Sequence, residues 1–141
     1  MMTLAQAQAM IAAGLAMARG AAMKPLALVV LDAGGHPVAT AREDGATFYR
    51  HTIAVAKAMG ALGMGDDSRV LAERAKGNPG FFQAVAATVG GQIACSPGGV
   101  LVRDSAGMVI GAIGVSGDTG DNDEAAALAG IRAAGLAGGA S

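Results

Sequence analysis

Two glycine-rich, largely apolar segments constrain the fold of this chain most strongly. The first covers residues 26–45 and the second residues 97–124. In each, an apolar run is interrupted by a short turn sequence, Asp-Ala-Gly-Gly from Asp32 and Asp-Ser-Ala-Gly from Asp104. Glycine adopts the positive φ angles of tight turns without steric cost, so each segment predicts two antiparallel strands joined by a turn. The two hairpins resemble each other in being rich in glycine, and we find no convincing internal repeat.

The rest of the chain carries sequence patterns that are typical of helices. Thr3 followed by Gln6 is a capping-box pattern, which predicts a helix from about Leu4 to Gly20. The other expected elements are strands at 26–31, 37–42, 100–103 and 108–116, and helices at 48–63 (N-cap Thr47), 69–76, 81–85 and 122–136. Residues 89–95 are compatible with a loop or an edge strand, and residues 138–141 are expected to fray. Hairpins with helices grouped beside them predict an α+β fold with a central antiparallel sheet.

Length, composition and net charge together exclude several classes of protein. A chain of 141 residues predicts one domain, residues 1–141. Hydrophobic residues make up 52% and charged residues 15%, so a monomer would have few polar groups for its surface, which predicts a homo-oligomer. The net charge of −1 argues against nucleic acid and anionic membranes as partners. No apolar run is long enough to cross a bilayer.

The single cysteine, Cys95, excludes an internal disulfide and suits a reducing compartment. With two histidines in the chain, it does not make a convincing zinc site. The first 18 residues carry no basic region of the kind that begins a secretory signal. We therefore expect a cytoplasmic protein.

The two histidines are the candidate metal and cofactor ligands. His36 ends the first turn, where an exposed imidazole can ligate haem iron or transfer a proton. His51 opens a helix and shares a stripe with Val55, where it can face a pocket. The alternatives are a polar turn residue for His36 and a hydrogen-bonded histidine at the edge of the core for His51.

Lys57 is the one charged residue between Thr52 and Gly65. It either extends to solvent or pairs with a carboxylate in a semi-buried site. In the second case it becomes a candidate base or anion anchor. Asp32 and Asp123 are candidate catalytic carboxylates, although Asp123 also suits the positive end of a helix.

A possible anion cradle follows the last strand. Ser116 and Gly117 lead, through a run of backbone amides, into the helix expected from residue 122. Amides at a helix start bind anions well, so these residues are candidates for cofactor binding. The alternative is a strand of small residues that permits tight helix packing.

Several of these motifs, taken together and in this order, resemble the GlcG/HbpS family of haem-binding and haem-degradation-associated proteins. The residues that carry the resemblance are 29–36, 53–58, 97–100, 111–117 and 123–124. The resemblance extends from Thr3 to about Leu136. The chain is similar in the same way to the C-terminal domain of PduO-type corrinoid adenosyltransferases, which is related to this family.

The resemblance implies a profilin-like fold with a sheet of about five strands, and homo-oligomers that are often octamers. It implies haem as a possible cofactor, bound in some members, whereas other members accompany catabolic operons. The N-terminal helix of this chain has no histidine, so an axial ligand used there in some relatives is absent.

Three functions remain open on this basis. The first is a cytoplasmic, oligomeric haem- or tetrapyrrole-binding protein, with His36 or His51 on the iron and Lys57 or the amides near Ser116 on a propionate. The second is a small cofactor-independent enzyme acting on an organic acid or aromatic catabolite, with Lys57 as anion anchor or base and Asp32, His36 or Asp123 in proton transfer. The third is a non-catalytic accessory or assembly protein.

Overall fold

A computed structural model describes residues 1–139 of the chain, which fold into a five-stranded antiparallel sheet with helices on both faces. The elements are, in order, α1 (Leu4–Gly20), β1 (Ala27–Asp32), β2 (Pro37–Arg42), α2 (Tyr49–Met64), α3 (Ser68–Gly77), α4 (Pro79–Thr88), β3 (Gly99–Arg103), β4 (Val109–Ser116), α5 (Gly120–Ala133) and β5 (Ala137–Gly138). The strand order is β2-β1-β4-β3-β5. The predicted α+β architecture is confirmed.

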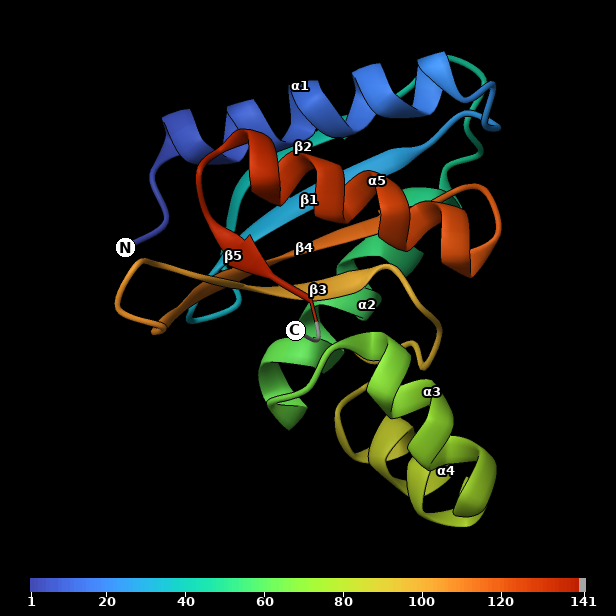
Figure 1. The fold of residues 1–141 in the computed structure, drawn as a ribbon. Coiled ribbons are helices and arrows are strands. Elements are labelled where there is room, and N and C mark those ends of the chain that lie inside the picture. The colour runs from blue at the N-terminus through green and yellow to red at the C-terminus, as the bar shows by residue number, and fades with distance from the viewer. Residues whose placement is uncertain (140–141) are drawn as a thin grey trace.

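The sheet separates two hydrophobic layers. Helices α1 and α5 lie side by side over one face, and α2 covers part of the other (Figure 1). The α1/α5 layer contains large side chains such as Met10, Leu28 and Ile131, whereas the α2 layer is built mostly from alanine and valine. Strand β1 is buried along nearly its whole length, as its continuous apolar sequence predicts.

Glycines in the sheet bring α2 unusually close to it. A Cβ atom at Gly114 of β4 would collide with the backbone carbonyl of Ala54 in α2, and one at Gly99 of β3 would collide with that of Lys57. The strands carry glycine at these points because no side chain fits between strand and helix. This close packing fixes the position of α2, which carries both His51 and Lys57.

Several predicted boundaries shift in the structure. The capping box of Thr3 and Gln6 is formed as predicted. The N-cap predicted at Thr47 is wrong, because the cap position is Phe48 and makes no side-chain cap bond. Residues 89–95 form no strand, and the short helical segment predicted at 81–85 is part of the ten-residue helix α4.

The end of the chain also differs from the prediction. Gly138, expected to fray, lies in β5 and pairs with Val102 of β3. Ala140 and Ser141, also expected to fray, lie outside the described residues. Across residues 1–139, no helix combines the length and the apolar character needed to cross a bilayer.

The two hairpin turns, residues 32–36 and 104–108, have the same structure. In both, the first residue is an aspartate whose Oδ1 accepts the amides of the third and fifth residues at 2.9–3.0 Å. In both, the fourth residue is a glycine with positive φ, 82° at Gly35 and 81° at Gly107. The hairpins therefore share an identical turn geometry as well as a glycine-rich composition, and their equivalent fifth residues are His36 and Met108.

Helices α3 and α4 form an arm that projects from the body of the molecule (Figure 1). Phe82 of α4 is buried beneath Arg74 of α3, whose guanidinium carbon lies 5.4 Å from the ring centroid. Phe81 and Val89 are exposed. No charged residue occurs between Lys76 and Arg103, so much of this arm offers an uncharged surface.

Candidate functional site

Lys57 and Asp123 form an ion pair in the interior. Their side chains lie 3.0 Å apart, Lys57 Nζ to Asp123 Oδ2, and the residues are 3% and 1% exposed. The ammonium also donates to the carbonyl oxygen of Val115 at 2.9 Å. The other carboxylate oxygen of Asp123 accepts the amide of Asp118 at 2.9 Å. The sequence left two alternatives for Lys57, and the structure has the one in which it pairs with a carboxylate.

This ion pair ties α2 to the start of α5 across the end of the sheet. Gly98, with φ of 130°, covers the ammonium so closely that a Cβ atom there would lie 2.9 Å from Lys57 Nζ. Neither Lys57 nor Asp123 lines any of the three cavities described below. The catalytic and anion-anchoring roles of these two residues stay predictions.

His51 lies on the wall of an apolar cavity of about 590 Å³ between α2 and the β1–β2 hairpin. From α2, His51, Val55 and Met59 face this cavity, because residues four apart share one side of a helix. From the sheet, its wall is formed by Val29, Leu31, Pro37 and Thr40, with Gly35 at the turn and Gln92 from the loop after α4. The predicted position of His51 facing a pocket at the start of a helix agrees with this placement.

His36 lies in a different cavity, a cleft of about 420 Å³ at one end of the sheet. Its side chain is 78% exposed, and its Nδ1 lies 3.3 Å from Asp32 Oδ1. The backbone amides of His36 and Gly34 donate to Asp32 and lower the pKa of its carboxyl. The structure thus brings Asp32 and His36 together, whereas His51 lines the other cavity.

The amides of the predicted anion cradle are largely occupied by the chain itself. Ser116 is buried, and a Cβ atom at Gly117 would collide with the carbonyl of Pro25. The amide of Asp118 donates to Asp123, and that of Asn122 donates to the hydroxyl of Thr119. A cofactor-binding role for Ser116 and Gly117 stays a prediction.

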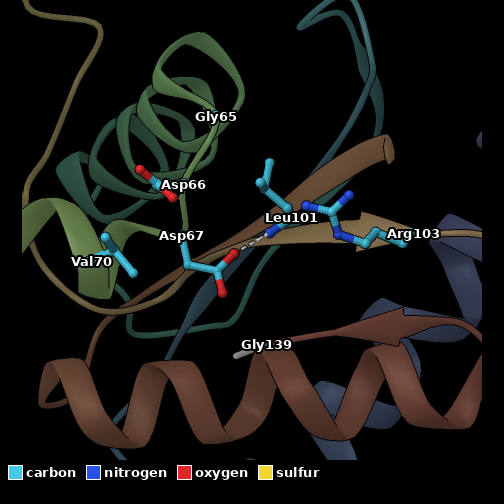
Figure 2. A pocket seen from close by; sticks show the side chains of 7 residues that line it. All are labelled: Gly65, Asp66, Asp67, Val70, Leu101, Arg103 and Gly139. Atoms are coloured by element: carbon cyan, nitrogen blue, oxygen red, sulfur yellow. Dashed lines mark hydrogen bonds between the residues drawn. The ribbon is translucent and has the colours of Figure 1, made fainter. Parts of the chain in front are cut away.

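A small polar groove beside β3 was not found from the sequence. It is lined by Asp66, Asp67, Arg103 and their neighbours, and Figure 2 shows the Asp67 carboxylate aimed at the amide of Leu101. That hydrogen bond is 2.8 Å long, and burial raises the pKa of Asp67. Asp67 occupies the N-cap position of α3, but its carboxylate makes no side-chain cap bond and bonds to β3 instead. An Asp-Ser sequence before a helix is typical of an N-cap. Nothing in the neighbouring sequence indicates that β3 lies within reach of the carboxylate.

Comparison with known proteins agrees with this architecture. A family model described as "Haem degrading protein HbpS-like" matches residues 2–132. The crystal structure of a PduOC–haem complex has a TM-score of 0.86 and 22% identity, covering 96% of each chain. Protein ORFY of Klebsiella pneumoniae gives a TM-score of 0.86 at 28% identity, over 95% of this chain and 90% of the other. The crystal structure of HbpS gives 0.79 at 26% identity, over 93% and 88%.

These matches define the structural class of the protein. It is an α+β protein whose sheet and helices are arranged as in HbpS and PduOC. The chain belongs to the HbpS-like haem-degrading protein family, because the family model covers nearly its whole length. This confirms the family resemblance that its motifs indicate. A search of curated proteins finds no significant match.

Proposed function

We propose that this protein binds haem or a related tetrapyrrole in the cavity between α2 and the β1–β2 hairpin, with His51 as the iron ligand. The observation that carries the proposal is the position of His51 on the wall of an apolar cavity of about 590 Å³. Cavities of roughly 300–1,000 Å³ with apolar walls and few polar groups are typical of small-molecule and cofactor sites. Membership of a family described as haem-degrading supports the choice of ligand.

The residues of this cavity fit a flat apolar macrocycle. One wall is the apolar face of β1 at Val29 and Leu31, and the facing wall is the stripe of α2 with Val55 and Met59. Both walls belong to regular elements held by the sheet and by the close contact at Gly114, so the site is supported by a rigid scaffold. When haem is bound, its iron supplies redox and ligand-binding chemistry that the side chains lack.

The chain contributes an iron ligand and polar groups at the cavity wall. A neutral imidazole at His51 provides a nitrogen lone pair to the iron. Thr40 and Gln92, also on the wall, carry the hydroxyl and amide groups that donate hydrogen bonds to propionates. These residues replace Lys57 as the anchor in this proposal, because the Lys57 ammonium is bonded to Asp123 and Val115.

The test is titration of the purified protein with haemin, followed by the Soret absorption. We expect a saturable, stoichiometric shift in the wild type that is lost in His51→Ala and kept in His36→Ala. Loss of the shift in His36→Ala alone would move the ligand to the other cavity. No specific shift in the wild type would refute haem binding.

A second variant tests the cavity without removing a ligand. Val55→Phe adds bulk to the α2 wall next to His51 and is expected to weaken haemin binding by at least about tenfold, which equals 1.4 kcal/mol. Its circular dichroism and thermal unfolding should stay close to those of the wild type, because Val55 is half-buried at the edge of its core cluster. Unchanged affinity in a folded Val55→Phe protein would exclude this cavity.

We also propose a cytoplasmic homo-oligomer, with the octamer of the family as the expected size. The support comes from the low charge of the chain and from the exposed, uncharged surface of α4, which includes Phe81. The absence of a second cysteine to pair with Cys95 is consistent with a reducing compartment. Sedimentation of the purified protein measures the assembly directly.

A further inference from the structure

The cleft at the end of the sheet gathers sulfur and imidazole donors that the proposed haem site does not use. Besides His36, it is lined by three methionines: Met1, Met2 and Met108. His36 and Met108 occupy the equivalent fifth positions of the two identical turns, 32–36 and 104–108. The turns lie side by side because β1 and β4, which they flank, are paired with Asp32 opposite Gly111.

The turn backbone holds these two residues in place. In each turn the aspartate carboxylate accepts the amide of the fifth residue at 3.0 Å, and the aspartate amide donates back to the carbonyl of that residue at 2.9–3.0 Å. The backbone at His36 and at Met108 is thus fixed by two hydrogen bonds each. Met2 is buried at the base of the cleft, where its methyl carbon lies close to Gly111 of β4.

We propose that this cleft is a binding site for Cu(I), with His36 and the thioether sulfurs of Met2 and Met108 as ligands and Met1 beside them. Thioether sulfur is a soft ligand that selects Cu(I), and imidazole is a ligand that copper accepts in either oxidation state. A methionine side chain has three rotatable bonds, so its sulfur can adjust to a metal ion placed by a more rigid ligand.

Asp32 holds the backbone of His36 and lies beside its ring. With Oδ1 of Asp32 3.3 Å from His36 Nδ1, Nδ1 faces the carboxylate and Nε2 lies on the other side of the ring. A histidine that donates one ring N–H to a carboxylate and offers the other nitrogen to a metal is the common arrangement in metal sites. The open side of the ring is accessible, because this side chain is largely exposed.

The same cleft suits hard cations poorly. One carboxylate oxygen of Asp32 and one of Asp104 already accept two backbone amides each. Within residues 1–139, no group of three or more His, Cys, Asp or Glu side chains is placed to hold a metal ion. Zinc, calcium and magnesium take carboxylate, imidazole or thiolate ligands, whereas three of the side-chain donors of the cleft are thioethers, which favour a soft ion.

The experiment is an anaerobic competition for Cu(I) between the protein and the chromophoric chelator bicinchoninate. We expect the protein to withdraw one equivalent per chain. His36→Gln and Met108→Leu should each weaken binding by at least about tenfold. The matched control is Met64→Leu, which removes a thioether from the C-terminal end of α2, outside the lining of the cleft, and should leave the affinity unchanged.

The thiol of Cys95 is also a soft ligand, so the titration is repeated with Cys95→Ser, which is expected to bind equally well. Failure of the wild type to compete would overturn the proposal. So would equal losses in Met64→Leu and Met108→Leu, loss of binding in Cys95→Ser, or Zn(II) binding as tight as Cu(I) binding.

A spectroscopic readout locates the ion independently of affinity. Among the eight methionine methyl signals, Ag(I), an air-stable substitute for Cu(I), should shift those of Met1, Met2 and Met108. Shifts spread evenly over all methionines would refute a defined site. Neither outcome bears on haem binding, because the proposed haem ligand lies in the other cavity.

Discussion

Replacing Lys57 by methionine should strongly destabilise the protein. The ammonium is almost fully buried and is bonded to Asp123 Oδ2 at 3.0 Å and to Val115 O at 2.9 Å. Methionine fills a similar volume but leaves the Asp123 carboxylate charged in the interior, with the amide of Asp118 as its remaining partner. Removing one partner of a buried ion pair costs about 3–5 kcal/mol, because the other charge is left uncompensated.

The measurement is equilibrium unfolding in urea. With a slope of about 2 kcal/mol per molar, a loss of about 4 kcal/mol lowers the midpoint by about 2 M. Adding Asp123→Asn to Lys57→Met removes the stranded charge while keeping an oxygen for the Asp118 amide. The double variant should therefore be more stable than Lys57→Met alone, a non-additivity expected of residues in direct contact.

The matched control is Lys76→Met, which breaks the exposed pair of Lys76 and Glu73 and should cost less than about 1 kcal/mol. A loss below about 1 kcal/mol in Lys57→Met would refute the reasoning, since that is the value of a solvated pair. So would a double variant less stable than Lys57→Met.

Further predictions concern packing, pH and assembly. Gly114→Ala should lower the free energy of unfolding by about 1–3 kcal/mol, measured by thermal unfolding, because the added methyl meets the Ala54 carbonyl; an unchanged melting temperature would contradict this close approach. The amides of Lys24 and Thr119 lower the pKa of Asp118 from 3.8 to about 2, so its contribution to stability is present above pH 3.8 and is lost as the pH falls through about 2. Asp118→Asn should flatten acid unfolding over that interval, and an unaltered acid profile would exclude the effect. Phe81→Asp should shift the sedimentation profile towards smaller species, and an unchanged profile would exclude α4 from the interface.

Much of the fold was predictable because its signals are local. The capping box of Thr3 and Gln6 and the turns that start at Asp32 and Asp104 involve hydrogen bonds between residues two to four apart. Such contacts depend on residue type and backbone geometry alone, so the sequence determines them. The continuous apolar run of β1 likewise indicates burial whatever covers it.

The sequence identified several candidate site residues, but it did not show where in the fold they lie or which of them share a cavity. Both histidines were identified from the sequence, whereas their assignment to different cavities depends on how β1, β2 and α2 are arranged. The methionines of the cleft gave no signal in the sequence, because isolated methionines usually fill cores. Their relation to His36 arises from strand pairing that places two distant turns together.

What the sequence by itself determined is the five helices, the first four strands, the two hairpin turns and the family. Only the tertiary structure decided that Lys57 pairs with Asp123, 66 residues away, and that Asp67 bonds to β3 instead of capping α3. A charged side chain in an apolar segment must find a partner, but the segment carries no information about which distant carboxylate is within reach. That choice is made when the glycines of β3 and β4 allow α2 to pack closely on the sheet.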